Sequence, residues 1–247
     1  MRINNSMMTV KPYTASGSKK KQVKQMFDRI SGEYDKLNHL LSAGIDIRWR
    51  KKTLAELGNV QPDAILDVAT GTGDFALMLH DHWPEAMVTG LDLSPGMLEV
   101  AGKKVAKAGL ENSIDLVEGD SENLPFEDNF FDLVTVGFGV RNFEHLSKGI
   151  SEMQRVLKPG GKLAILEFTK PRTPVVKQLF QWYFKHLLPR IGGAISGDTA
   201  AYRYLFDSVQ AFPEYEALTD IMTGAGFSKT YYKPLTFGIC CIYIGEK

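Results

Sequence analysis

The segment Ile65–Ala76, with the sequence Ile-Leu-Asp-Val-Ala-Thr-Gly-Thr-Gly-Asp-Phe-Ala, constrains the fold of this chain more than any other. An apolar run includes the carboxylate Asp67, a glycine-rich turn follows, and an apolar helical pattern begins at Phe75. This order predicts a buried strand that enters a helix through a loop where a ligand can contact the backbone. Because Gly71 and Gly73 lack a Cβ and adopt positive φ easily, a nucleoside can lie against the main chain there.

The glycine spacing does not by itself identify the nucleotide. Gly71-x-Gly73-x-x-Ala76 also fits the dinucleotide fingerprint, in which a pyrophosphate lies at the helix N-terminus. Asp74 follows at the start of the helix, where its charge repels a pyrophosphate but suits a ligand with a sulfonium and an ammonium group. We therefore expect S-adenosylmethionine, with an NAD-dependent reductase as the alternative.

Composition restricts the class of protein. The 247 residues, 44% apolar and 23% charged, indicate one large α/β domain. Lys and Arg total 29, as do Asp and Glu, so we expect no nucleic-acid partner. The only cysteines, Cys240 and Cys241, are neighbours in a strand-like run, where their side chains point to opposite faces. We expect no disulfide between them and a reducing, cytoplasmic location.

Two segments flank or interrupt the predicted core. Residues 1–22 are polar and then basic, and we expect a disordered tail there. A single domain should follow over 23–247. It begins with a helical cap at 23–62, interrupted near Gly32, and contains a helical insertion at 170–213 that covers the acceptor site.

The core alternates strand and helix patterns. Strands are predicted at 64–69, 87–92, 114–118, 130–137 and 162–168, with helices at 74–82, 95–108 and 146–157. This alternation predicts a parallel sheet covered by helices on both faces.

Carboxylates follow the second and third predicted strands. Asp92 ends the second strand about 20 residues after the glycine loop, where an acid reaches ribose hydroxyls. Ser94 before Pro95 is the better candidate for capping the next helix. Asp120 can accept a hydrogen bond from an adenine amino group, while the amide of Ser121 donates to a ring nitrogen. All three groups should lie at the carboxyl edge of the sheet.

Three blocks outside the glycine loop carry a resemblance to a known family. They are Tyr-Asp-Lys-Leu-Asn-His-Leu-Leu-Ser at 34–42 followed by Trp49, Gly-Phe-Gly-Val-Arg-Asn at 137–142, and Arg-Val-Leu-Lys-Pro-Gly-Gly at 155–161 followed by Glu-Phe-Thr at 167–169. With these blocks the chain resembles class I S-adenosylmethionine-dependent methyltransferases. More narrowly, it resembles the family that methylates a ring carbon of menaquinone and ubiquinone precursors. Asp46, Leu37 and Thr169 depart from that family's usual residues.

The resemblance implies a fold and a set of cofactor contacts. The fold is a Rossmann-like α/β domain with a seven-stranded, mostly parallel sheet, helices on both faces and an antiparallel last strand. The implied contacts add Thr72 and Gly137 to the residues reached above, and we include two residues near strand ends, Asp67 and Leu93. The expected cofactor-binding set is Asp67, Gly71, Thr72, Gly73, Asp92, Leu93, Asp120, Ser121 and Gly137. No His/Cys cluster has metal-ligand spacing, so we expect no metal.

The resemblance also implies the reaction, which is C-methylation of a polyprenylated quinol. The preferred acceptor is 2-demethylmenaquinol, giving menaquinol in the last step of menaquinone biosynthesis. The alternative acceptor is 2-polyprenyl-6-methoxybenzoquinol of ubiquinone biosynthesis. The reductase alternative lacks its usual helical Tyr-x-x-x-Lys pair, since Tyr243 and Lys247 fall on a predicted terminal strand.

Removing a phenolic proton makes the adjacent ring carbon nucleophilic, so a group that stabilises phenolate should lie near the methyl group. Arg141 and Asn142 follow the fourth strand, and we hypothesise that Arg141 stabilises the phenolate while Asn142 orients an oxygen. The alternative for Arg141 is a surface ion pair. Tyr34 and Asn38 of the helical cap are candidate contacts of the acceptor.

The insertion contains an apolar stripe at 176, 179, 180, 183, 184, 187 and 188. Such a helix can cover an isoprenoid tail or lie on a membrane, which would make the protein peripheral to the inner face of the cell membrane. The alternative is packing against the sheet or against a second copy in a homodimer. Glycines at 192, 193 and 197 predict a mobile lid over the acceptor.

Overall fold

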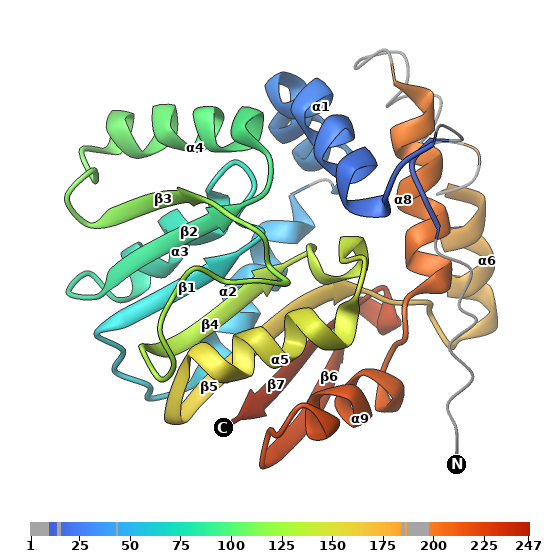
Figure 1. Cartoon of the computed structure of the whole chain (residues 1–247). Helices are drawn as coiled ribbons and strands as arrows, with labels where there is room; N and C mark the ends of the chain where they lie inside the picture. Colours follow the sequence, from blue (N-terminus) through green and yellow to red (C-terminus); the bar gives the residue numbers. More distant parts are fainter. Residues whose placement is uncertain (1–9, 14–15, 43, 184–185, 187–197) are drawn as a thin grey trace.

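A seven-stranded sheet forms the centre of the molecule (Figure 1). The computed structural model describes residues 10–13, 16–42, 44–183, 186 and 198–247. The strands are β1 (Ala64–Val68), β2 (Met87–Asp92), β3 (Ile114–Glu118), β4 (Phe131–Gly137), β5 (Leu157–Phe168), β6 (Lys229–Leu235) and β7 (Cys240–Glu246). Their order is β3-β2-β1-β4-β5-β7-β6. The first five are parallel, and β7 runs antiparallel to β5 and β6. The expected fold is confirmed.

The helices follow the predicted pattern closely. They are α1 (Lys19–Ser42), α2 (Ile45–Leu57), α3 (Asp74–His82), α4 (Pro95–Ala108), η1 (Val140–Asn142), α5 (Leu146–Val156), α6 (Pro174–Trp182), α8 (Thr199–Ala211), α9 (Glu216–Gly224) and η3 (Thr236–Gly238). The predicted cap of α4 is confirmed, because the Ser94 hydroxyl accepts a hydrogen bond from the Met97 amide at 3.2 Å and Pro95 is the first helical residue.

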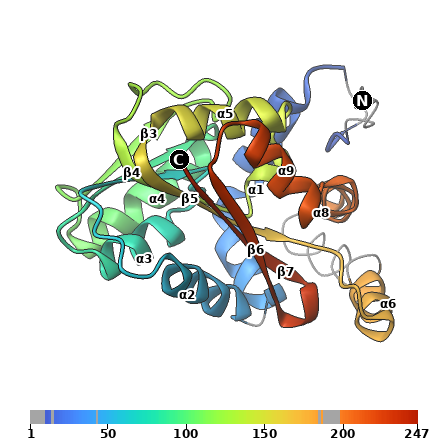
Figure 2. The same cartoon turned by 90° about the horizontal axis from the view of Figure 1, so that it is seen from below.

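Alternation along the strands builds one core on each face of the sheet. Leu66 of β1 packs with α5 and α9, whereas its neighbour Ile65 packs with α2 and α3. Figure 2 shows these two helix pairs on opposite sides of the strands. Cys240 and Cys241 divide in the same way, and both thiols are buried and free. Burial raises the pKa of each thiol.

A third apolar cluster joins the helical cap to the insertion. It contains Met26 and Ile30 of α1, Met97 of α4, Phe180 of α6 and Tyr204 of α8. Figure 1 shows α1 between α4 and α8. Hydrogen bonds fix α1 on the start of α4, because Asp28 Oδ1 accepts from the Ser94 hydroxyl at 2.6 Å and from the Gly96 amide at 3.1 Å. The cap and the insertion therefore enclose space beside the sheet.

The predicted N-terminal boundary at residue 22 needs a correction. Helix α1 begins at Lys19, and Lys19 and Gln22 are only 8% and 2% exposed. The Lys19 ammonium donates to the carbonyls of Arg141 and Phe143 at 2.9 and 2.8 Å, and burial lowers its pKa to about 8. A lysine in a basic run is typical of a solvated tail, but here it caps carbonyls of another element. Residues 1–9 and 14–15 lie outside the described part of the chain.

One other detail differs from expectation. Helix α1 continues through Gly32, because one exposed glycine costs a helix only about 1 kcal/mol, and the helix is anchored by buried Met26 and Ile30 before it and by partly buried Tyr34 after it. Helix α6 spans Pro174–Trp182, and the described residues Tyr183 and His186 beyond it are also helical. Positions 184, 187 and 188 of the predicted stripe, and the predicted lid at 192–197, lie outside the described residues.

Candidate functional site

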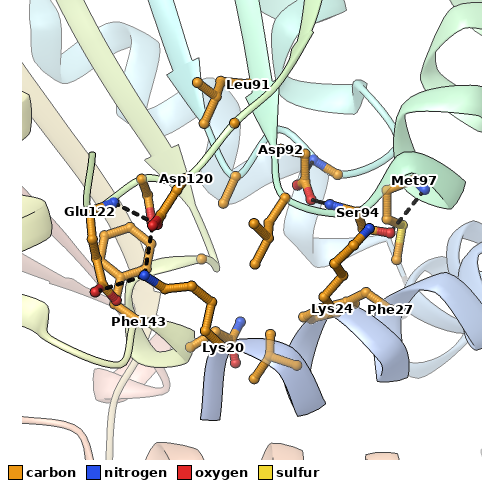
Figure 3. A pocket seen from close by; sticks show the side chains of 18 of the residues that line it. Lys20, Lys24, Phe27, Leu91, Asp92, Ser94, Met97, Asp120, Glu122 and Phe143 are labelled. Atoms are coloured by element: carbon orange, nitrogen blue, oxygen red, sulfur yellow. Dashed lines mark hydrogen bonds and ion pairs between the residues drawn. The ribbon is translucent and has the colours of Figure 1, made fainter. Parts of the chain in front are cut away.

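Two cavities adjoin at the carboxyl edge of the sheet. The smaller, of about 80 Å³, lies at the ends of β1, β2, β3 and β4. Helix α1 closes it from the opposite side, as Figure 3 shows. Lys20 points from α1 toward Asp120 and Glu122, whereas Lys24 points toward the side of Asp92 and Ser94.

Six of the nine predicted cofactor-binding residues line this cavity: Gly71, Asp92, Leu93, Asp120, Ser121 and Gly137. The sheet topology brings them together, because each follows or ends a parallel strand. Gly71 has a φ of +59°, and no atom lies within 4 Å of where a Cβ would stand. The loop therefore presents open backbone to a ligand.

Asp92 fixes the geometry of the cavity wall. One of its carboxylate oxygens accepts from the Gly71 amide and the other from the Ser94 amide, both at 2.8 Å. Desolvation raises the pKa of Asp92, and these amide hydrogen bonds oppose that shift. A carboxylate has about four lone-pair sites, so Asp92 keeps capacity to accept from a ribose hydroxyl.

The other three predicted cofactor residues are described but are not among those that line the cavity. Asp67 is 1% exposed and accepts from the hydroxyls of Thr70 and Thr135, both at 2.6 Å. Burial raises the pKa of Asp67 to about 6. Thr72 donates its hydroxyl to Asp35 at 2.5 Å. Asp67 and Thr72 therefore stabilise the glycine loop: Asp67 through the hydroxyl of Thr70, and Thr72 through a hydrogen bond to Asp35 of α1.

Gly73 serves the packing of the same loop. Its φ is +82°, and a Cβ there would lie 3.1 Å from the Cβ of Ala101 in α4. The second glycine of the motif thus allows the loop to approach α4 closely.

Asp74 is paired with a lysine, so its charge does not support the choice of cofactor. Lys104 lies 2.6 Å from Asp74 and 2.5 Å from Asp35, so a cation of the chain itself already neutralises these carboxylates. Asp74 is not among the described residues that line the cavity. At the start of α3 the Asp74 carboxylate is paired with Lys104 of α4, and the choice of cofactor rests on other observations.

Two residues near the loop after β3, Lys20 and Glu122, were not predicted from the sequence. Lys20 lies 2.7 Å from Asp120 and 3.1 Å from Glu122. Glu122 is 1% exposed, and its other oxygen accepts from the amides of Glu144 and His145 at 2.7 and 3.0 Å. Glu122 therefore ties this loop to the start of α5. No local pattern marks it, since its partners lie about 20 and 100 residues away.

The larger cavity, of about 400 Å³, is predominantly apolar. Side chains of α1, α2, α6 and α8 line it, together with residues beside the β6–β7 turn. Four residues line both cavities: Phe27, Tyr34, Phe138 and Asn142. Two of them, Tyr34 and Asn142, are predicted site residues. The side chain of Asn38 lies outside the described part of α1.

Arg141 lies in the wall of the larger cavity. It forms a 2.7 Å ion pair with Glu167, in which 5% of the Arg141 side chain and none of the Glu167 side chain is exposed. It also donates to the Phe138 carbonyl, and its guanidinium lies 5.6 Å from the centre of the Phe168 ring. Burial raises the pKa of Glu167, while the charge of Arg141 opposes that shift. A surface ion pair is thus not the role of Arg141.

A second ion pair gives the cavity another polar wall. Asp46 and Arg50 are 2.5 Å apart, with 7% and 10% of their side chains exposed, and Ser42 donates its hydroxyl to Asp46 at 2.6 Å. Asp46 is one of the positions that depart from the resembling family, and here it is the ion-pair partner of Arg50. The cavity therefore combines an apolar interior with charged groups in its wall.

Among the described residues, no group of three or more His, Cys, Asp or Glu side chains has the arrangement of a metal site. No helix in the described ranges is long and apolar enough to cross a membrane.

Comparisons with known proteins agree with this geometry. The model of the ubiE/COQ5 methyltransferase family matches residues 15–247. A demethylmenaquinone methyltransferase of Bacteroides fragilis is 47% identical over 246 residues, covering 99% of this chain and 100% of the relative. One of Chlorobaculum tepidum is 48% identical over 229 residues, covering 91% and 92%. A solved methyltransferase structure from Thermotoga maritima has a TM-score of 0.66 at 18% identity, covering 91% of this chain and 99% of that chain, and shows the shared fold.

Proposed function

Because the chain belongs to the ubiE/COQ5 methyltransferase family, we propose that it methylates a ring carbon of demethylmenaquinol with S-adenosylmethionine as the donor. One structural observation carries this proposal. A smaller cavity with carboxylates and open backbone at the strand ends and a larger apolar cavity share the wall residues Phe27, Tyr34, Phe138 and Asn142. A donor in the first and an aromatic acceptor in the second would meet at that wall.

The smaller cavity has groups that fit the cofactor. Asp92 has lone pairs for the ribose hydroxyls, and Asp120 has lone pairs for the adenine amino group. Gly71 leaves room for the nucleoside against the backbone. When bound, S-adenosylmethionine supplies an electrophilic methyl group on a sulfonium. The protein has to hold the acceptor carbon in line with that bond.

The proposal assigns the acceptor chemistry to Arg141 and Asn142, and their position in the wall of the larger cavity supports it. Loss of a phenolic proton places negative charge on the quinol oxygen and electron density on the adjacent ring carbon. That carbon forms the new bond to the methyl group while the carbon–sulfur bond breaks, and loss of the ring proton then restores the aromatic ring. Arg141 stabilises the phenolate charge from the cavity wall, and Asn142 orients the oxygen beside both cavities. Tyr34 contacts the ring at the same wall.

The assay uses purified protein, radiolabelled S-adenosylmethionine and two reduced acceptors, demethylmenaquinol and the demethylated methoxybenzoquinol. We expect label on the naphthoquinol. Label on the benzoquinol alone would assign the chain to the ubiquinone reaction instead. Absence of transfer to both acceptors, with S-adenosylhomocysteine binding intact by calorimetry, would overturn the proposal.

The larger cavity suits the isoprenoid tail, and its outer wall suits a membrane. Val175, Leu179 and Trp182 of α6 are 67%, 64% and 58% exposed, and Leu179 also lines the cavity. Helix α6 lies at the periphery in both Figure 1 and Figure 2. Phe237 is 77% exposed and follows Thr236, another lining residue. We infer that these side chains contact the inner face of the cell membrane, from which the prenylated acceptor enters the cavity.

Flotation with phosphatidylglycerol-containing vesicles tests the membrane contact. The double variant Val175→Glu/Trp182→Glu should lose flotation, because neither residue lines the cavity and both gain charge. The matched control is Met87→Glu/Phe130→Glu, which changes two half-exposed apolar residues at the amino ends of β2 and β4. Equal flotation of both variants contradicts the proposal. A dimer by light scattering that only the α6 variant abolishes would assign the face to a second copy.

A further inference from the structure

Unpaired polar atoms concentrate in the wall of the larger cavity. Six buried side-chain polar atoms have no hydrogen-bond partner within the described chain. Four of the six belong to residues that line this cavity: Arg50 Nε, Arg141 Nε, Asn142 Oδ1 and the Tyr204 hydroxyl. A buried polar atom without a partner is costly, so such a cluster indicates polar groups of a ligand.

A quinol supplies polar groups at two places on an otherwise apolar molecule. Its two ring oxygens lie para to each other, one beside the reacting carbon and one beside the carbon that carries the prenyl tail. Asn142 lines both cavities, so we assign it as the partner of the oxygen beside the reacting carbon. The second oxygen needs another partner in the wall of the larger cavity.

We propose that Tyr204 binds this second ring oxygen and makes the enzyme selective for a 1,4-diol, an inference that rests on the proposed function. Tyr204 is in α8, is 3% exposed and lines only the larger cavity. It packs in the cluster that joins α1, α6 and α8, so its ring is fixed by apolar neighbours while its hydroxyl is left unpaired.

The electrostatic surroundings of Tyr204 agree with this role. Burial raises the pKa of Tyr204 well above its ordinary value, so the phenol stays protonated at neutral pH and can donate a hydrogen bond. The positive charge of Arg141 lowers the pKa of Tyr204 and the negative charge of Glu167 raises it, so the Tyr204 hydroxyl lies near this ion pair. Tyr204, Arg141 and Asn142 thus line one cavity, with the Tyr204 hydroxyl close enough to the ion pair to be affected by its charges.

The test combines one variant with one acceptor analogue. Tyr204→Phe removes only the hydroxyl. The analogue is a 1-naphthol with the same alkyl chain but without the second hydroxyl, so its reacting carbon keeps the activating oxygen. For Tyr204→Phe we expect kcat/KM of the diol to fall about 3- to 10-fold and kcat/KM of the analogue to stay within about twofold of wild type. The melting temperature should be unchanged or higher, because the lost hydroxyl has no partner to lose.

Tyr243→Phe is the matched control. The Tyr243 hydroxyl is buried, accepts from the Tyr215 amide at 2.9 Å and is not among the described groups that line either cavity. This variant should lower the melting temperature and keep the wild-type preference for the diol. An unchanged diol rate in Tyr204→Phe, or an equal fall for both acceptors, overturns the role of Tyr204. If wild type fails to methylate the diol itself, the proposed function fails, and this inference fails with it.

Discussion

Arg141, which follows β4, and Glu167, near the end of β5, form a 2.7 Å ion pair in which both side chains are buried. The pair stands in the wall of the cavity that we assign to the acceptor. The contribution of this ion pair to stability and the proposed catalytic role of Arg141 can be tested separately, because the charge of Arg141 has a different partner in each. Folding needs the charge of Arg141 neutralised, whereas the reaction needs that charge beside a phenolate.

Glu167→Gln should reduce the free energy of unfolding by about 3–5 kcal/mol, since it leaves a buried guanidinium without its counter-ion. Urea denaturation measures this loss. The control Glu56→Gln breaks the more exposed pair with Lys233 and should cost less than about 1 kcal/mol. The double variant Arg141→Met/Glu167→Met should recover stability without recovering methyl transfer. Full activity in the double variant would remove Arg141 from the reaction.

Asp92→Asn should weaken S-adenosylhomocysteine binding about 10- to 100-fold, because hydrogen bonds to a charged carboxylate are worth about 1.5–3 kcal/mol. An amide NH₂ would also face one of the two backbone amides that Asp92 now accepts from. Isothermal titration calorimetry measures the affinity, and Asp115→Asn on the exposed side of β3 is the control. Binding within twofold of wild type would contradict a ribose role for Asp92.

Asp67→Asn should change the pH dependence of stability. The folded-state pKa of Asp67 is raised to about 6 from an ordinary 3.8, so the folded chain binds more protons than the unfolded chain between these values. Wild-type stability therefore falls as pH rises through this window, and a shift of about two pKa units corresponds to about 3 kcal/mol. The variant lacks this contribution.

The stability of Asp67→Asn relative to wild type should accordingly rise between pH 3.5 and 7, as measured by urea denaturation. Asn can both accept from and donate to the hydroxyls of Thr70 and Thr135, so the fold should tolerate it. A difference that stays constant with pH would contradict the raised pKa. Cofactor affinity should stay near the wild-type value, because Asp67 is not among the described residues that line the cavity.

Gly32→Ala should stabilise the protein by up to about 1 kcal/mol, because glycine is a poor helix former and Gly32 lies inside α1. A Cβ there meets no atom within 4 Å. Gly139→Ala should destabilise instead, since its Cβ would lie 2.6 Å from the Cβ of Ala69, which has no rotamer to change. Thermal unfolding of the two variants measures both effects. A lower melting temperature for Gly32→Ala would contradict a continuous α1.

The fold and the edge of the sheet at which ligands bind could be predicted from the amino-acid sequence alone. Alternating apolar periods specify the strands and helices, and the short loops after parallel strands bring Gly71, Asp92 and Asp120 to one edge. The start of α4 could also be predicted from Ser94 and Pro95, because capping involves only neighbours along the chain. Such local rules act within a few residues and can be read from the sequence.

Which of these residues face a cavity depends on how distant elements pack, and the sequence alone does not predict it. Asp67 and Asp74 lie within the same motif as Gly71, yet one is buried beneath the loop and the other is paired with Lys104. Lys20 reaches Asp120 across 100 residues, and Tyr204 joins the acceptor cavity only because α8 packs against α1. These contacts form between residues that are far apart in the sequence. They depend on how the helices pack on the sheet and on which charged groups this packing brings together, and a local sequence pattern contains neither kind of information.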